Sequence, residues 1–140
     1  MSLLVVDASA ILRALLPGQD PEGAVSGTIA MLLAAGAELI APDILVYEMG
    51  RAASRFRADA MNQQAVVPRG LQLVRLVRPG PDVLAAALAT AVEEGLSFYD
   101  AAYVALARSE GTSLWTEDVA ILQTCADVAV DTATLARRHR

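Results

Sequence analysis

The chain has 140 residues, which at ~100 to 200 residues per domain predicts a single domain over residues 1–140. Hydrophobic residues make up 55% of it and aromatic residues 4%, which excludes intrinsic disorder and indicates a core of mainly Ala, Leu and Val. The net charge is −5, and the longest uncharged stretch of the first half, residues 23–37, is shorter than the ~20 residues of a membrane span, so we expect a cytoplasmic protein with neither signal peptide nor membrane segment.

The first half of the chain alternates short apolar runs with helical patterns. The first run is continuous and apolar, typical of a strand buried on both faces of a parallel sheet, and it ends at Asp7. Pro21, with Asp20 as N-cap, predicts the start of the second helix. In chain order we predict a strand, two helices, a strand and a helix over residues 3–6, 8–16, 21–36, 38–41 and 43–60.

The middle of the chain is less regular. Between residues 61 and 78 a helical pattern contains Pro68 and Gly70, which we expect to break it, and residues 73–77 fit either a final turn or a third strand. The next helix, over residues 82–94, is apolar nearly all round, which predicts that it is buried.

The last third of the chain returns to alternation. It predicts a helix, a strand, a helix and a strand over residues 100–110, 112–116, 118–125 and 128–130, and then a short helix ending in a basic tail. Strands alternating with helices imply an α/β fold, with a central, mostly parallel β-sheet flanked by helices.

Two acidic residues follow predicted strands directly or nearly so. Asp7 comes after the first strand, and Asp118 lies two residues after the strand that ends at Thr116. Ligands of open parallel sheets bind at the carboxyl ends of the strands, which makes these positions candidates for a site. Taken singly, each is explained more simply as a helix N-cap, and so is Asp100, which begins a predicted helix.

Glu48 does not fit the N-cap explanation. It lies inside a predicted helix among apolar neighbours, where a charge needs a partner. An ion pair with Arg51 or Arg55 on nearly the same helical face would provide one. That ion pair explains one acid and not four.

Several kinds of catalytic chemistry are excluded by composition. The chain has one cysteine and one histidine, Cys125 and His139, which excludes a Cys/His zinc cluster and leaves a Ser-His-Asp or Cys-His site dependent on His139 reaching in from the end of the chain. Every basic residue other than His139 is arginine, so a Walker A loop, a Schiff base and lysine-assisted aspartyl phosphate chemistry are excluded. Carboxylates, hydroxyls, arginines and a metal held by carboxylates remain.

Four short motifs contain the acids discussed above. They are Asp7-Ala8-Ser9 after an apolar strand, Ala41-Pro42-Asp43 before a helix carrying Glu48, Tyr99-Asp100-Ala101 followed by residues 103–107, and Thr116-Glu117-Asp118 after a strand. Together they resemble the motifs of the PIN domain family, and by size the chain is most similar to the VapC toxins of bacterial toxin–antitoxin pairs. The order and separations of these motifs cover nearly the whole chain.

This resemblance implies an acidic centre formed by Asp7, Glu48, Asp100 and Asp118. It implies that these acids bind Mg²⁺ or Mn²⁺ and cleave single-stranded RNA, with Ser9 and Thr116 as supporting hydroxyls. It also implies a small VapB-like antitoxin as partner.

Elementary electrostatics agrees with a metal at such a centre. Two carboxylates ~4 Å apart repel by ~4 kcal/mol at an effective dielectric of 20, so four converging acids need a cation. Oxygen ligands suit Mg²⁺ or Mn²⁺, and a metal-bound water is a nucleophile suited to attack on a phosphodiester. With the four acids set aside the net charge is close to neutral, and Arg13, Arg51 and Arg55 become candidate contacts to the RNA backbone.

Other functions fit the sequence less well. A receiver-type signalling domain has an acidic magnesium pocket but needs a lysine, and a haloacid dehalogenase-like phosphatase needs an Asp where Ser9 stands. A catalytically inactive PIN-like module that binds RNA or protein remains the main alternative. Five leucines of the first two helices further predict self-association, with a homodimer as the expected state. They are Leu12, Leu15, Leu16, Leu32 and Leu33.

Overall fold

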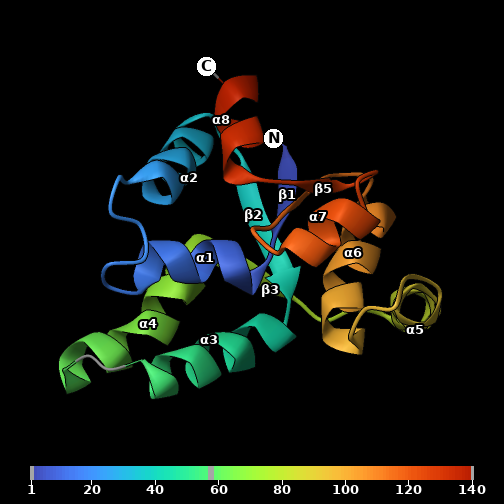
Figure 1. The fold of residues 1–140 in the computed structure, drawn as a ribbon, viewed down its shortest axis with the longest axis horizontal. Coiled ribbons are helices and arrows are strands. Elements are labelled where there is room, and N and C mark those ends of the chain that lie inside the picture. The colour runs from blue at the N-terminus through green and yellow to red at the C-terminus, as the bar shows by residue number, and fades with distance from the viewer. Residues whose placement is uncertain (1, 57–58, 140) are drawn as a thin grey trace.

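The computed structural model describes residues 2–56 and 59–139, which form a parallel β-sheet and the helices around it (Figure 1). The strands are β1 (Leu3–Val6), β2 (Glu38–Pro42), β3 (Val74–Val77), β4 (Leu114–Trp115) and β5 (Ala129–Val130). The helices are α1 (Ala8–Leu15), α2 (Ala24–Ala34), α3 (Ile44–Arg55), α4 (Ala60–Leu73), α5 (Pro81–Glu94), α6 (Phe98–Glu110), α7 (Val119–Thr124) and α8 (Thr132–Arg138).

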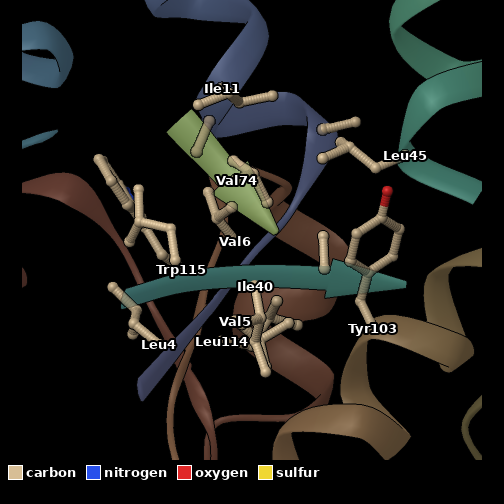
Figure 2. Close-up of a cluster of buried hydrophobic side chains, with 14 of the residues drawn as sticks. Leu4, Val5, Val6, Ile11, Ile40, Leu45, Val74, Tyr103, Leu114 and Trp115 are labelled. Carbon is tan, nitrogen blue, oxygen red and sulfur yellow. The ribbon is translucent and has the colours of Figure 1, made fainter. Parts of the chain in front are cut away.

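The strands lie in the order β3-β2-β1-β4-β5, and every neighbouring pair is parallel. This confirms the predicted α/β fold. The first strand, β1, is the central one, and its residues Val5 and Val6 are fully buried, as a continuous apolar run predicts. Figure 2 shows them within the hydrophobic cluster that the sheet shares with its helices.

The register of the central strands decides where the site can form. Val6 at the end of β1 pairs with Trp115 at the end of β4. The residues that follow, Asp7 and Thr116, therefore leave the same edge of the sheet side by side. Because β2 is parallel to β1, the helix that follows it, α3, starts from this edge as well.

The prediction for the second helix was wrong at its start. Helix α2 begins at Ala24 rather than at Pro21, after a left-handed Gly23. Asp20 still serves this helix, because its carboxylate accepts hydrogen bonds from the backbone N–H groups of Val25 (3.1 Å) and Ser26 (2.9 Å). Asp20 therefore caps the helix as predicted, but from four residues before its first residue, Ala24, and not from the position next to it.

The helix predicted over residues 43–60 is shorter than expected, since α3 ends at Arg55 and α4 begins at Ala60. Residues 57 and 58, which that prediction included, lie outside the described residues, as does Arg140 of the basic tail. The carboxylate of Asp59 caps α4 by accepting a hydrogen bond from the Asn62 N–H (2.9 Å).

The prediction that Pro68 and Gly70 break the following helix was also wrong, because α4 continues through both. Gly70 is buried against α3, where an added Cβ would lie 2.4 Å from Sδ of Met49. Close packing of the two helices therefore offsets the poor helix propensity of proline and glycine. The segment left open as a turn or a strand forms strand β3.

Helix α5 is not buried, contrary to its apolar sequence. Leu84, Leu88 and Val92 are 40%, 58% and 78% exposed, and the helix buries Ala87 and Thr90. Figure 1 shows α5 as the outermost element on its side, beyond α6. The sequence pattern shows that a helix is apolar but not how many neighbours will cover it. Across the described ranges, none of the helices has both the length and the hydropathy needed to cross a membrane.

Candidate functional site

Figure 1 shows α1, α3 and α7 following the ends of β1, β2 and β4. A pocket of about 330 Å³ opens at these strand ends. It brings together all four acids predicted from the sequence and two of the three predicted arginines. Its lining residues are Asp7, Ala8, Ser9, Leu12, Glu48, Arg51, Ala52, Arg55, Asp100 and Asp118.

Asp7 lies deepest in this pocket, with only 4% of its surface exposed. Its Oδ2 accepts hydrogen bonds from Oγ1 of Thr116 (2.7 Å) and Oγ of Ser9 (2.9 Å). Although it occupies the N-cap position of α1, its side chain makes no capping hydrogen bond, so the N-cap explanation was wrong for Asp7. Burial raises its pKa and the Asp100 charge adds to this, while the two hydroxyls act in the opposite direction.

Ser9 and Thr116 form a fixed cradle beneath the Asp7 carboxylate. Oγ of Ser9 accepts the backbone N–H of Glu117, and Oγ1 of Thr116 accepts the backbone N–H of Asp118, each at 3.0 Å. A hydroxyl has a single proton, and in both residues that proton is donated to Asp7. The ends of β1 and β4 are thereby held together, and the orientation of Asp7 is set by residues on both.

Glu48 is half-buried on α3 and faces the same pocket. Its Oε1 accepts a 2.5 Å hydrogen bond from the hydroxyl of Tyr103. In the described residues neither Arg51 nor Arg55 forms an ion pair with it, so that explanation of Glu48 was wrong. Burial raises the pKa of Glu48 and the charges of Asp7 and Asp100 raise it further, against the Tyr103 hydrogen bond and the Arg51 charge.

Tyr103, which contacts Glu48, is the neighbour of the pocket that sequence reasoning missed. It follows Asp100 by three positions, which places both on nearly the same face of α6. That spacing was the available signal. Burial, and next the Glu48 charge, raise the pKa of its phenol, so the hydroxyl stays protonated and acts as a donor.

Asp100 lies in the first turn of α6 but does not cap it. The cap is Ser97, whose Oγ accepts the backbone N–H of Asp100 at 3.0 Å. The carboxylate of Asp100 is therefore free to line the pocket. Burial raises the pKa of Asp100, and the Asp118 charge raises it further.

Asp118 caps a helix and also lines the pocket. Its Oδ1 accepts the backbone N–H of Ile121 at 3.0 Å, which confirms it as the N-cap of α7. In the pocket it lies near enough to Asp100 for its charge to raise the pKa of that carboxyl.

The predicted arginines divide into two groups. Arg51 and Arg55 are exposed at the rim of the pocket, one turn apart on the helix that carries Glu48. Arg13 is exposed on α1 and is not part of the lining. Neither Cys125 nor His139 lines the pocket, so its chemistry rests on carboxylates.

The donor set fits a hard divalent cation. All of its ligating side-chain atoms are oxygens, and three of the four carboxyls have pKa values raised by burial and by one another, a condition that a cation would relieve. Within residues 2–56 and 59–139, as the side chains stand, no three Asp, Glu, His or Cys residues lie close enough together to hold a metal ion. Mg²⁺ and Mn²⁺ suit such an open arrangement, since Mg²⁺ keeps several waters and binds through one or two carboxylates and substrate phosphate.

Comparison with known proteins gives a family match over most of the chain. The family model described as PIN domain matches residues 4–127. No curated protein sequence matches the chain significantly.

Solved structures share the fold over nearly the full length. PAE2754 from Pyrobaculum aerophilum is 27% identical, with a TM-score of 0.70 over 98% of this chain and 96% of that one. VapBC2 from Rickettsia felis, bound to a DNA fragment from its promoter, is 13% identical, with a TM-score of 0.70 over 92% and 98%. VapC20 of Mycobacterium tuberculosis, described as a toxin that cleaves the sarcin-ricin loop, is 20% identical, with a TM-score of 0.66 over 89% and 94%.

Proposed function

Because this chain belongs to the PIN domain family, we propose that it is a metal-dependent endoribonuclease that cleaves single-stranded RNA as the toxin of a toxin–antitoxin pair. The observation that carries this proposal is the convergence of four carboxylates and two arginines on one pocket. The fold shared with the sarcin-ricin loop-cleaving toxin VapC20 supports RNA as the substrate.

In the proposed reaction Asp7, Glu48, Asp100 and Asp118 hold Mg²⁺ or Mn²⁺. When bound, the cation supplies an activated water for attack on the phosphodiester and neutralises negative charge that develops on the phosphate. The hydroxyls of Ser9 and Thr116 keep the Asp7 carboxylate in place.

The arginines at the rim act on the substrate in this proposal. Arg51 and Arg55 bind backbone phosphates and draw the RNA toward an otherwise acidic pocket. Because both lie on the helix that carries Glu48, the helix aligns the bound strand with the acids.

The proposed partners are RNA, a small VapB-like antitoxin and a second copy of the chain. Fold similarity to VapBC2, itself a toxin–antitoxin assembly by its name, supports the antitoxin. The leucines predicted to favour a homodimer are largely used in the core, because Leu15 and Leu32 are buried and Leu12 and Leu16 pack against it. Support for self-association comes instead from the exposed apolar side chains of α5, Leu84, Leu88 and Val92.

The test is cleavage of a labelled single-stranded RNA with Mn²⁺ and with chelator. We expect cleavage with Mn²⁺ alone and a loss of orders of magnitude in Asp100→Asn. Asp82→Asn is the matched control, because Asp82 also lies in the first turn of a helix but is exposed and outside the pocket.

Two outcomes contradict the proposal. Full activity of Asp100→Asn in a preparation free of contaminating ribonuclease would remove Asp100 from the site. A wild-type protein that binds RNA but does not cut it with Mn²⁺ or Mg²⁺ would favour the inactive binding module.

A further inference from the structure

The hydrogen bond between Tyr103 and Glu48 joins two of the helices that carry the proposed site. Tyr103 belongs to α6, which also provides Asp100, and Glu48 belongs to α3. The two residues are 55 positions apart, and the distance between the phenol oxygen and Oε1 is 2.5 Å. A bond this short between a hydroxyl and a carboxylate belongs to the strong, charge-assisted class.

The ring of Tyr103 is buried, which keeps its hydroxyl directed at Glu48. It is 0% exposed, and Figure 2 shows the ring at the side of the buried hydrophobic cluster, with its hydroxyl at the end nearest Leu45 of α3. The phenol therefore presents its single proton from a fixed position. Glu48, by contrast, is half-buried and has several rotatable side-chain bonds, so it needs an external restraint to keep one orientation.

The second carboxylate oxygen of Glu48 is left for the pocket. Oε2 accepts no hydrogen bond from the described residues, and among these residues no buried side-chain oxygen lacks a partner, so Oε2 is accessible. One oxygen is thus held by the core while the other stays available beside Asp7 and Asp100.

We propose that Tyr103 is a positioning residue that fixes the Glu48 carboxylate for cation binding. This inference rests on the proposed function, because it assigns Glu48 to the metal. Partners that orient a metal ligand contribute about tenfold to a hundredfold to metal affinity or activity in known sites. Tyr103 would act in this way on Glu48, as Ser9 and Thr116 do on Asp7.

A purely structural role is the competing explanation. Buried hydroxyl and indole groups usually find a hydrogen-bond partner somewhere, as Trp115 does through Oγ1 of Thr132, outside the pocket. Tyr103 differs because its partner is a carboxylate that lines the pocket. A structural bond would affect stability, whereas a positioning bond would affect Mn²⁺ affinity.

The test compares three Tyr→Phe variants, each losing only a hydroxyl. Tyr103→Phe removes the bond, while Tyr47→Phe on α3 and Tyr99→Phe on α6 change side chains that are 73% and 57% exposed. Titration calorimetry with Mn²⁺ alone should give a dissociation constant about tenfold or more above wild type for Tyr103→Phe and unchanged values for both controls. In RNA cleavage, kcat should fall while KM for RNA stays near the wild-type value, since the hydroxyl does not reach the rim.

A double variant shows whether Tyr103 acts through Glu48. Once Glu48→Gln has removed the charged ligand, adding Tyr103→Phe should weaken Mn²⁺ binding no further. An equal loss in both backgrounds would overturn the inference, as would wild-type Mn²⁺ affinity in Tyr103→Phe alone.

Two further results separate this inference from its premise. If Tyr103→Phe loses its cooperative melting transition while Tyr47→Phe keeps it, the hydroxyl is a determinant of folding and the positioning role is wrong. If wild type neither binds Mn²⁺ nor cleaves RNA, the proposed function fails and this inference fails with it. Wild-type binding and cleavage with an unaffected Tyr103→Phe would overturn the positioning role alone.

Discussion

Asp7 carries its charge in the least exposed position of the site. Two hydroxyl donors satisfy one of its oxygens, yet burial still raises its pKa, so the hydrogen bonds do not fully replace the lost water. A buried charge held at such a cost to stability is typical of a binding or catalytic group rather than of a structural one.

Asp7→Asn should therefore stabilise the protein in chelator and remove its response to metal. Asparagine keeps an oxygen that accepts from Ser9 and Thr116 but carries no buried charge. A cation at 100 times its dissociation constant stabilises by about 2.7 kcal/mol, a shift of several degrees in Tm. Thermal melts should show that shift with Mn²⁺ in wild type and almost none in Asp7→Asn.

Asp131→Asn is the control for this experiment. Asp131 caps α8 by accepting the Thr134 N–H at 2.8 Å, and it lies outside the acidic pocket. Asparagine caps nearly as well, so this variant should melt and respond to Mn²⁺ like wild type. Identical Mn²⁺ responses in Asp7→Asn and wild type would exclude Asp7 from the metal site.

The pH dependence of stability follows from the same carboxyls. Burial raises the pKa of three site residues, Asp7, Glu48 and Asp100. Hydrogen bonds lower the pKa of three others, Asp20, Asp127 and Asp131. A carboxyl whose pKa is raised binds more protons in the folded protein than in the unfolded protein. Its contribution to the free energy of unfolding therefore falls as pH rises above the ordinary pKa, which is 3.8 for Asp and 4.5 for Glu.

In chelator, Tm should therefore decline as pH rises above about 4. The groups with lowered pKa values do not oppose this, because their contribution is complete above pH 3.8 and is lost only below it. Asp7→Asn should flatten the decline, which melts at a series of pH values would measure. A slope that is the same in both proteins would mean that Asp7 is not protonated more readily in the folded state.

At the scale of elements, strand ends were predictable and helix details were not. The apolar run before Asp7 and the parallel sheet were sufficient to place Asp7 and Asp118 at one edge. The sequence could not show that Ser97 rather than Asp100 caps α6, because both residues are good caps and only the backbone conformation distinguishes them. Tyr103 was missed because, apart from its three-residue spacing from Asp100, a tyrosine within an apolar helix resembles an ordinary core residue.

Burial of helices was the least predictable property. Helix α5 has an apolar sequence, yet Leu88 is 58% exposed because α5 packs on α6 at the outside of the fold. Helix α4 continues through Pro68 because tertiary packing outweighs local propensity. Both depend on contacts between segments distant in sequence, which a pattern along one segment does not contain.

The two roles of Asp118 can be separated by comparing two substitutions. Asp118→Asn keeps the cap of α7 and should lower RNA cleavage by orders of magnitude with little change in Tm. Asp118→Ala should lose the same activity and also about 1 kcal/mol of stability. Parallel cleavage assays and melts would measure both. Wild-type cleavage by Asp118→Asn would leave Asp118 as a cap alone.

Packing of α3 against α4 can be tested with two helical glycines. An alanine Cβ at Gly70 would lie 2.4 Å from Sδ of Met49, which is fully buried and has little room to move. At Gly50 the nearest atom is 4.0 Å away. Denaturant unfolding should show Gly70→Ala destabilised by about 1 kcal/mol or more, and Gly50→Ala neutral or stabilised by up to about 1 kcal/mol. Equal stabilities would mean that Met49 can move aside.

Charge is distributed unevenly over the whole molecule. The net charge of −5 opposes binding to RNA in general, yet Arg51 and Arg55 line the pocket that holds the four acids. These two positive charges therefore stand at the place where a phosphate would be cleaved, and a bound cation would add to the attraction there.

The salt dependence of RNA binding tests this distribution directly. Each phosphate contact on a single strand contributes about 0.7 to the slope of log affinity against log salt, because binding releases condensed counterions. In an Asp100→Asn background, which prevents cleavage, Arg51→Ala and Arg55→Ala should each weaken binding and reduce the slope by about that amount. Arg138→Ala, exposed at the end of α8 and outside the pocket lining, should change neither. A weaker slope in Arg13→Ala would show that the bound RNA continues along α1. Unchanged slopes for Arg51→Ala and Arg55→Ala would show that RNA does not enter through this rim.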